Sequence, residues 1–328
     1  MSAPALQVGG LTIGYRTATG VASAVSEVSL EVARGEIFGL VGESGCGKST
    51  LAAATLGMLP GSAEVSGDIR VAGRSLAGMD AEALRGMRGN EVAIVVQDPL
   101  TSLDPTFSVG SQIVETIRAH RNVDKRTAHA RAVELMSQVG IPEPERRFGD
   151  PPHRFSGGQR QRIVIAIALA NEPALLIADE PTTALDVTIQ KQILGLLRRL
   201  RDERGMAIVL ITHDLAVVAE TCDRVGVMYA GQLVEVTDAA ALADGACHPY
   251  TRALLSALPT AEHEPGALTV IAGEIPDLES PPPGCRFAPR CTRRIDACAR
   301  RPALTGGPDA VACWLHADAE HPVAETSR

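Results

Sequence analysis

A nine-residue, glycine-rich segment has the residue types needed to bind phosphate groups. It reads GESGCGKST and consists of Gly42, Glu43, Ser44, Gly45, Cys46, Gly47, Lys48, Ser49 and Thr50. Glycines let a backbone loop wrap closely around phosphates and point its N–H groups at them. A lysine in this place can reach the terminal phosphates, and the serine hydroxyl can coordinate Mg²⁺. The pattern predicts a bound nucleoside triphosphate with Mg²⁺.

The segments on either side of this loop are of the kind that such a site requires. Residues 37–41 are apolar and predict a buried strand before the loop, and residues 49–59 predict a helix after it. The positive end of that helix would face the phosphates. A chance glycine-rich turn, the alternative, does not account for this strand, loop and helix in sequence.

A second apolar segment ends in two carboxylates. Residues 174–181 read ALLIADEP, and a buried strand of this kind delivers acidic groups to the carboxyl edge of a parallel sheet. We expect Asp179 to hold Mg²⁺ together with Ser49, and Glu180 to act as the general base that polarises the attacking water. Many strands end in a solvated carboxylate, so this segment alone is weak evidence for a nucleotide site. Together with the phosphate-binding loop it is strong evidence.

A further pair of glycines stands at the start of a predicted helix. Residues 155–162 read FSGGQRQR, and the helix start at Ser156, Gly157, Gly158 and Gln159 would present N–H groups and a positive dipole. A helix that is merely capped by Ser156 would explain the serine but not the accompanying motifs. The set resembles the ATP-binding subunits of ABC transporters, whose signature is usually LSGGQ; Phe155 replaces the leucine.

The resemblance implies roles for four further positions. Gln97 matches a glutamine that contacts Mg²⁺ and the attacking water, and His213 in ITHD matches a histidine that senses the γ-phosphate. Asp186 lies in TTALD, which matches the loop after the carboxylates, with Thr183 where serine is more usual. Tyr15 is the best candidate for an aromatic ring stacked on adenine, although a lone tyrosine in a strand more often serves packing.

The order of predicted elements indicates an α/β fold. Residues 5–35 alternate between apolar and polar and predict antiparallel strands, whereas 92–97, 174–179 and 207–212 predict buried strands. A predicted helix at 187–204 between two such strands indicates a parallel sheet. Together with the resemblance this predicts a RecA-like ATPase core with an antiparallel β subdomain, an α-helical signature subdomain at about 98–170, and a small cysteine-rich C-terminal extension.

Composition changes near residue 259, where proline becomes frequent. We predict a nucleotide-binding domain at 1–258 and a C-terminal extension at 259–328. The extension divides into an irregular linker to residue 284, a cysteine-bearing lobe at 285–313, and a mobile tail in the last dozen residues.

Charge and hydropathy limit where the protein acts. The 328-residue chain has a net charge of −8, which does not favour a nucleic-acid partner. Its longest strongly apolar run, at 163–170, is too short to cross a bilayer, and no secretory signal is visible. We therefore expect a soluble, cytosolic protein that reaches a membrane only through partners.

The resemblance extends over residues 5–316 and is most specific for one branch. The segments at 95–105, 186–197, 248–259 and 273–291 resemble oligopeptide and dipeptide importers. Nickel importers are a close alternative, but their ATPases commonly stop before such a C-terminal extension. A soluble ABC ATPase acting on DNA or ribosomes, and a redox regulator built on the cysteines, are more distant alternatives.

Membership of this branch implies a set of partners. A paralogous ATP-binding subunit would close head to tail on this one, so that each ATP lies between one chain's phosphate loop and the other's signature. Residues 98–120 would dock on two integral membrane permease subunits, and an extracytoplasmic peptide-binding protein would deliver the substrate. The protein would then lie at the cytoplasmic face of the cell membrane as a peripheral subunit.

Four of the seven cysteines lie close together in sequence: Cys285, Cys291, Cys298 and Cys313. Their spacing lacks the tight pairs of structural zinc sites and the spacings of ferredoxins, so the residues alone leave a metal site or free thiols open. The resemblance implies a [4Fe–4S] cluster, because several peptide-importer ATPases look to carry one on such a tail. We expect this lobe to be distant from the ATP site.

Outside this group of four, Cys46 is the cysteine for which the sequence predicts chemical reactivity. It lies inside the phosphate-binding loop, next to a predicted helix start and to Lys48. Both neighbours lower the pKa of a thiol. The sequence therefore predicts a reactive thiol that bound Mg-ATP protects from alkylation.

Overall fold

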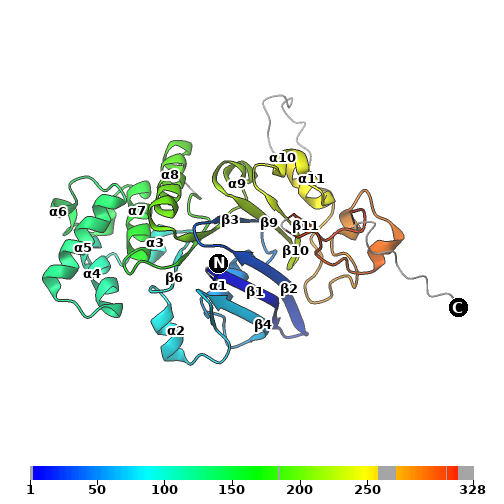
Figure 1. Ribbon diagram of the computed structural model, residues 1–328, viewed down its shortest axis with the longest axis horizontal. Coiled ribbons are helices and arrows are strands. Elements are labelled where there is room, and N and C mark those ends of the chain that lie inside the picture. Colours follow the sequence, from blue (N-terminus) through cyan, green and yellow to red (C-terminus); the bar gives the residue numbers. More distant parts are fainter. Residues whose placement is uncertain (1–2, 184, 258–270, 308, 317–328) are drawn as a thin grey trace.

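The computed structural model describes residues 3–183, 185–257, 271–307 and 309–316. Two sheets organise these residues, with helices at one end of the molecule and an irregular C-terminal segment at the other (Figure 1). The predicted tail, and the predicted linker as far as residue 270, lie outside the described residues.

The smaller sheet is antiparallel and has the strand order β2-β1-β4-β5. Its strands are β1 (Leu6–Arg16), β2 (Val21–Val32), β4 (Ala63–Val71) and β5 (Arg74–Ser75). Leu6, Val8, Leu11 and Ile13 of β1 are buried. The antiparallel subdomain predicted from residues 5–35 is confirmed, but β4, β5 and the helix α2 (Ala81–Met87) were not predicted.

The larger sheet has the order β11-β10-β9-β3-β8-β7-β6. Its parallel strands are β3 (Ile37–Val41), β6 (Val92–Val95), β7 (Leu175–Asp179), β8 (Ala207–Ile211) and β9 (Arg224–Tyr229). Every residue of β3 and β8 is buried, as expected for parallel strands covered on both faces. Because the strands are parallel, the residues that follow β3, β6, β7 and β8 meet at one edge of the sheet.

Two antiparallel strands complete this sheet. β10 (Gln232–Asp238) forms a hairpin with β9, and β11 (Ala310–Val311) pairs with β10. The hairpin turns at Gly231. Its φ of 82° is a left-handed backbone conformation that glycine adopts without strain. Since β11 comes from the C-terminal extension, this segment is joined to the main sheet by backbone hydrogen bonds.

Helices cover the larger sheet and form a separate group beyond β6. The first set is α1 (Lys48–Thr55), α8 (Val187–Arg204), α9 (Leu215–Thr221), α10 (Leu242–Gly245) and α11 (Pro249–Ser256). The second set is α3 (Pro99–Ser102), α4 (Val109–His120), α5 (Lys125–Gln138), α6 (Pro144–Arg147) and α7 (Gly157–Ala168). The predicted helix at 187–204 is confirmed, whereas α1 ends at Thr55, four residues early, because Gly57 takes a left-handed conformation.

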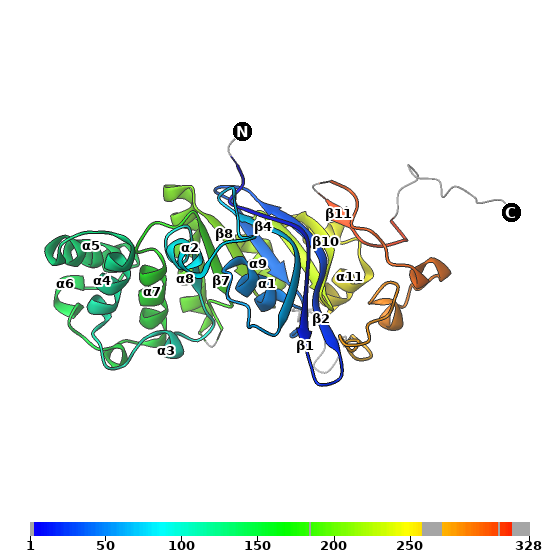
Figure 2. The same cartoon turned by 90° about the horizontal axis from the view of Figure 1, so that it is seen from below.

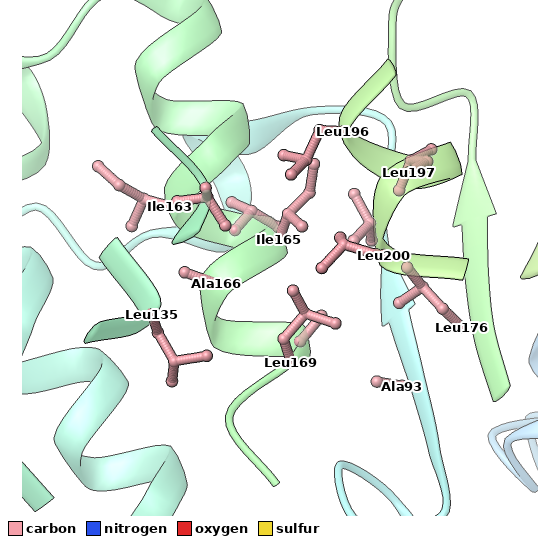
Figure 3. Close-up of a cluster of buried hydrophobic side chains, with 14 of the residues drawn as sticks. Ala93, Leu135, Ile163, Ile165, Ala166, Leu169, Leu176, Leu196, Leu197 and Leu200 are labelled. Carbon is pink, nitrogen blue, oxygen red and sulfur yellow. The ribbon is translucent and has the colours of Figure 1, made fainter. Parts of the chain in front are cut away.

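Helix α7 joins the helical group to the larger sheet. Figure 3 shows its Ile163 and Ile165, with Leu169 directly after its last residue, between Leu135 of α5 and the leucines of α8. Ile163, Ile165 and Leu169 are fully buried. A helix packed on several sides needs apolar residues all round, which explains why this segment has little amphipathic pattern. The packing fixes the position of the residues at the start of α7.

The C-terminal extension is irregular and lies against β10 and α11, at the opposite end from α4, α5 and α6 (Figures 1 and 2). It contains two short 3-10 turns, Ala288–Arg290 and Asp296–Ala299. Phe287 is buried and contacts the rings of Tyr229 and Tyr250. The division into domains at residue 258 stays a prediction. In the described part of the chain, no helix combines the length and apolar character needed to span a membrane.

Candidate nucleotide-binding site

The phosphate-binding loop joins β3 to α1, and its glycines are required by backbone shape and by space. Gly42, Gly45 and Gly47 have φ values of 151°, 79° and 103°. A Cβ atom at Gly42 would lie 2.2 Å from the carbonyl oxygen of Met228, and one at Gly47 would lie 2.3 Å from that of Ala24. Strands β9 and β2 therefore enclose the loop from behind.

Lys48 braces this loop from inside. Its side chain is buried, and Nζ donates hydrogen bonds to the carbonyl oxygens of Gly42 at 2.7 Å and Glu43 at 3.0 Å. Ser44, Gly45 and Ser49 are exposed, so the open face of the loop is its outer side. A hydrogen bond of 3.5 Å joins the Tyr15 hydroxyl to Thr50 Oγ1, which brings the predicted adenine-stacking residue to the start of α1.

Asp179 lies at the end of β7, beside Ser49. Burial raises the pKa of the Asp179 carboxyl, although a hydrogen bond from the Ser49 hydroxyl opposes this shift. A cation between the two side chains would favour the ionised carboxylate. The arrangement therefore fits the predicted Mg²⁺ position, which is assigned to these residues as a proposal below.

Glu180 follows directly and is held by groups from three strand ends. Its backbone is left-handed, with φ of 47°, and its N–H donates to the Ile211 carbonyl oxygen at 2.9 Å. Its carboxylate accepts hydrogen bonds from Gln97 Nε2 at 3.0 Å and Thr183 Oγ1 at 2.9 Å. His213 Nδ1 lies 3.3 Å from the same carboxylate. These residues follow β6, β7 and β8.

The charge state of Glu180 suits a general base. Burial raises the pKa of this carboxyl, but hydrogen bonds from Thr183 and His213 outweigh that effect and leave the pKa below its usual value. An ionised, partly exposed carboxylate can accept a proton from a water molecule. The contact with Thr183 was not predicted, although a hydroxyl three residues after the carboxylate was a visible signal.

The signature residues form a capped helix start at α7. The Ser156 hydroxyl accepts from Gln159 N at 3.4 Å, and Gln159 Oε1 accepts from Ser156 N at 3.2 Å. A Cβ atom at Gly158 would lie 2.5 Å from Ile189 Cγ2, so glycine is required there by the approach of α8. Asp186 caps α8 by accepting from Ile189 N at 3.0 Å.

The start of α7 and the start of α1 lie apart in both views (Figures 1 and 2). The structure brings together Tyr15, Lys48, Asp179 and Glu180 with their neighbours. Among the described residues, no hydrogen bond joins the phosphate-binding loop to Ser156, Gly157, Gly158, Gln159 or Asp186. A nucleotide role for the signature residues stays a prediction.

The lowered pKa predicted for the Cys46 thiol is wrong, whereas its protection from alkylation by bound Mg-ATP stays a prediction. Its side chain is only 1% exposed, and burial raises the pKa of the thiol despite the opposing effect of Lys48, whose Nζ lies 3.6 Å from the sulfur. Sequence showed the neighbouring charge but not the desolvation, which has the larger effect here.

The four clustered cysteines lie within range of one another's charge. Burial raises the pKa of Cys285 to about 11, and the thiols of Cys298 and Cys313 add to the rise. Burial also raises the pKa of Cys313, to which Cys291 and Cys298 contribute. Among the residues that the structure describes, no group of three or more His, Cys, Asp or Glu is arranged to hold a metal ion. The iron–sulfur prediction thus receives no direct support.

The expectation that the cysteine-bearing lobe lies far from the ATP site is wrong. Arg290, which precedes Cys291, forms an ion pair with Glu43 of the phosphate-binding loop. The two residues are 247 positions apart in the chain, so the sequence contained no local sign of this contact.

The fold and this site define an ATP-binding cassette. The profile of the family described as "ABC transporter" matches residues 25–183, and that described as "Oligopeptide/dipeptide transporter, C-terminal region" matches residues 234–298. A post-hydrolysis dimer of an ATP-binding cassette with ADP and phosphate has a TM-score of 0.64 and 27% identity, covering 71% of this chain and 98% of that one.

Similar sequences narrow the assignment. The dipeptide transport ATP-binding protein DppD of Bacillus subtilis is 45% identical, over 97% of each chain. The oligopeptide transport ATP-binding protein OppD of Haemophilus influenzae is 42% identical, over 96% of this chain and 98% of that one. The chain belongs to the ABC transporter ATP-binding proteins, in the oligopeptide/dipeptide branch, which confirms the predicted family and its ATPase class.

Proposed function

We propose that this protein is the ATP-hydrolysing motor subunit of an importer for dipeptides or oligopeptides. The observation that carries the ATPase part is the convergence of Gln97, Thr183 and His213 on Glu180, at the sheet edge that also bears the phosphate-binding loop. The match of residues 234–298 to the oligopeptide/dipeptide C-terminal region supports peptides as the cargo.

Mg-ATP would occupy the loop and the adjoining sheet edge. Lys48 would turn from the loop carbonyls to the terminal phosphates, and Tyr15 would stack on the adenine. Ser49, Asp179 and Gln97 would hold Mg²⁺, which supplies positive charge to the phosphate oxygens. Glu180 would accept the proton of the attacking water while His213 contacts the γ-phosphate.

Hydrolysis requires a second subunit in this proposal. Ser156, Gly157, Gly158 and Gln159 would complete the site of a paralogous ATP-binding subunit, head to tail, with Asp186 at the junction. The separation of α7 from α1 within one chain supports this arrangement, as does the dimer found for the similar cassette with ADP and phosphate. We expect the purified chain alone to hydrolyse ATP slowly; a fully active rate independent of protein concentration would contradict the head-to-tail site.

The membrane partners would bind the segment that follows Gln97. Within 98–120, the side chains of Leu100 and Phe107 are 61% and 55% exposed, and such apolar groups favour a protein contact. Two integral permease subunits would dock there and place the protein at the cytoplasmic face of the membrane. An extracytoplasmic peptide-binding protein would deliver the substrate, and no nucleic acid takes part.

Transport assays with the assembled complex test the cargo. The complex, reconstituted in proteoliposomes with its binding protein, should hydrolyse ATP faster when dipeptides or oligopeptides are supplied, and labelled peptide should accumulate in the lumen. Stimulation by Ni²⁺ without peptide would indicate the nickel branch instead. Failure of the chain to co-purify with any integral membrane subunit would contradict the transport function itself.

We also propose that Cys285, Cys291, Cys298 and Cys313 hold a [4Fe–4S] cluster. The support is that neighbouring thiols of this set raise the pKa of both Cys285 and Cys313, and that thiolates are soft donors. A single zinc ion needs all its sulfur ligands at about 2.3 Å from one point. A four-iron cluster instead gives each thiolate its own iron, so the thiols stand farther apart.

The metal content of anaerobically purified protein tests this assignment. We expect a brown protein with broad visible absorption and about four irons per chain, the content of a single cluster. Colourless protein with one zinc ion, or metal-free protein in which all four thiols react with an alkylating reagent, would contradict it.

A further inference from the structure

The ion pair between the C-terminal extension and the phosphate-binding loop is bidentate and largely buried. Arg290 Nη1 donates to Glu43 Oε2 at 2.8 Å, and Nη2 donates to Glu43 Oε1 at 3.2 Å. The Arg290 side chain is 4% exposed and that of Glu43 is 26% exposed. Planar guanidinium and carboxylate groups paired in this way fix each other's orientation as well as their charge.

Arg290 is itself held rigidly by the extension. Its Nε donates to the Ala272 carbonyl oxygen at 3.0 Å, and Nη2 also donates to that of Ile271 at 3.1 Å. The Tyr229 hydroxyl lies 3.3 Å from Nη1. The guanidinium therefore has a fixed position that does not depend on Glu43 alone.

A second contact holds the backbone of the same loop residue. Glu43 N donates to the Tyr250 hydroxyl at 2.9 Å, and Tyr250 is completely buried. Its ring packs on Tyr229, with a centroid distance of 4.6 Å, and on Phe287 of the extension at 5.4 Å. The side chain and the backbone of Glu43 are thus both oriented by residues that follow the core ATPase motifs in the chain.

The chemistry of the loop makes this pairing necessary. A loop that binds a triphosphate attracts anions, and a carboxylate within it repels them. Glu43 supplies such a carboxylate, because it follows Gly42 and precedes the exposed residues Ser44 and Gly45 in the loop. An arginine that takes both carboxylate oxygens offsets the charge and keeps the side chain in the direction of the extension.

We propose that Arg290 is a positioning residue for ATP binding: by neutralising and orienting Glu43, it makes the C-terminal extension part of the nucleotide site. The inference rests on the proposed ATP site but not on a cluster at the cysteines. It assigns a function to the extension within this same chain.

Affinity for Mg-ATP in the full-length protein tests the inference, with a fluorescent ATP analogue as the displaced probe. Arg290→Gln should raise the Kd about tenfold, the order expected for one unpaired charge near the phosphates. Glu43→Gln should change it less than threefold. The double variant should return to the value of Glu43→Gln, because the repelling carboxylate is gone. Salt should reduce the Arg290→Gln defect by screening.

Arg301→Gln is the matched control. Arg301 also ties the extension to the core, through an ion pair with Glu27 and hydrogen bonds to Ser26, but it does not contact the phosphate-binding loop. It should leave the Kd unchanged. Equal defects in Arg290→Gln and Arg301→Gln, without rescue by Glu43→Gln, would show a merely structural extension and overturn the proposal.

Two further outcomes separate this inference from the proposed function. Unchanged affinity in Arg290→Gln, with normal binding by the unsubstituted protein, would refute the inference alone. Absence of Mg-ATP binding by the unsubstituted protein would refute the nucleotide site and the inference with it.

Discussion

The phosphate-binding loop and the carboxylate cluster around Glu180 adjoin each other but are built in opposite ways. The loop is enclosed by β2 and β9 and braced by a buried lysine and a buried arginine. Around Glu180, by contrast, Gln97 and His213 are exposed, and the contacts to its carboxylate come from side chains on three different loops.

This difference separates binding from hydrolysis. A loop that is already in its phosphate-binding shape loses little conformational entropy when the nucleotide arrives. A cluster of exposed polar groups can be rearranged or completed by a contact from another subunit. We interpret the loop as the preorganised part of the site and the Glu180 cluster as the part on which assembly acts.

Removing the proposed base should separate ATP hydrolysis from ATP binding more strongly than any other substitution proposed here. Glu180→Gln keeps the shape of the side chain but cannot accept a proton, so ATP turnover in the assembled complex should fall about 10²-fold or more. The Kd for Mg-ATP should change little, because the loop is untouched. Near-normal turnover in this variant would show that Glu180 is not the base.

Lys48→Ala should have the opposite effect to Glu180→Gln, because it should weaken the binding of Mg-ATP itself. It removes a charge-assisted contact to phosphate and the internal brace on Gly42 and Glu43. The Kd for Mg-ATP should rise about 10- to 100-fold, which corresponds to the free energy of one or two such hydrogen bonds. Equilibrium binding measures this directly; a variant with normal affinity but reduced turnover would place Lys48 with the catalytic group instead.

Thr183→Val should have a smaller effect, confined to turnover. The change removes the hydroxyl that donates to Glu180 at 2.9 Å but preserves the side-chain volume. Loss of one hydrogen bond to this ionised, partly exposed carboxylate corresponds to about a tenfold loss of rate. Thr182→Val is the control, since no hydrogen bond joins the Thr182 hydroxyl to Glu180 in the described part of the chain. Equal rates for the two variants would exclude a special role for Thr183.

How far the sequence predicts this molecule depends on whether a feature is local. The strands at 37–41 and 175–179 are continuous apolar runs, as buried parallel strands require, and both were predicted. The strand at 63–71 was missed because most of its residues are exposed and its alternation is weak. The glycines and Lys48 of the loop are likewise recognisable from spacing alone.

Features that depend on distant packing could not be predicted. Arg290 and Glu43 meet only because the extension returns to β10 and packs beside Tyr229 and Tyr250. Cys46 is buried within the phosphate-binding loop, which β2 and β9 enclose, and this burial raises the pKa of its thiol. The charged neighbour Lys48, visible in the sequence, led to the opposite expectation. The predictions for Cys46 and for the position of the cysteine-bearing lobe failed for the same reason: tertiary contacts set the surroundings of these residues, and the local sequence does not show such contacts.

Alkylation of Cys46 provides the finest test of how closed the loop is. Because burial raises the pKa of this thiol above its usual range, its thiolate fraction near pH 7 is below that of an ordinary cysteine. We expect slow labelling at pH 7 that accelerates about tenfold per pH unit towards pH 9, since only the thiolate reacts. Bound Mg-ATP should slow it further by restraining the loop.

Mass spectrometry of the labelled peptide distinguishes Cys46 from the other six cysteines. Cys222, which is also strongly desolvated, serves as an internal reference outside the loop. Rapid labelling of Cys46 at pH 7 would mean that the loop opens readily in solution, and the contrast with the Glu180 cluster would then be lost.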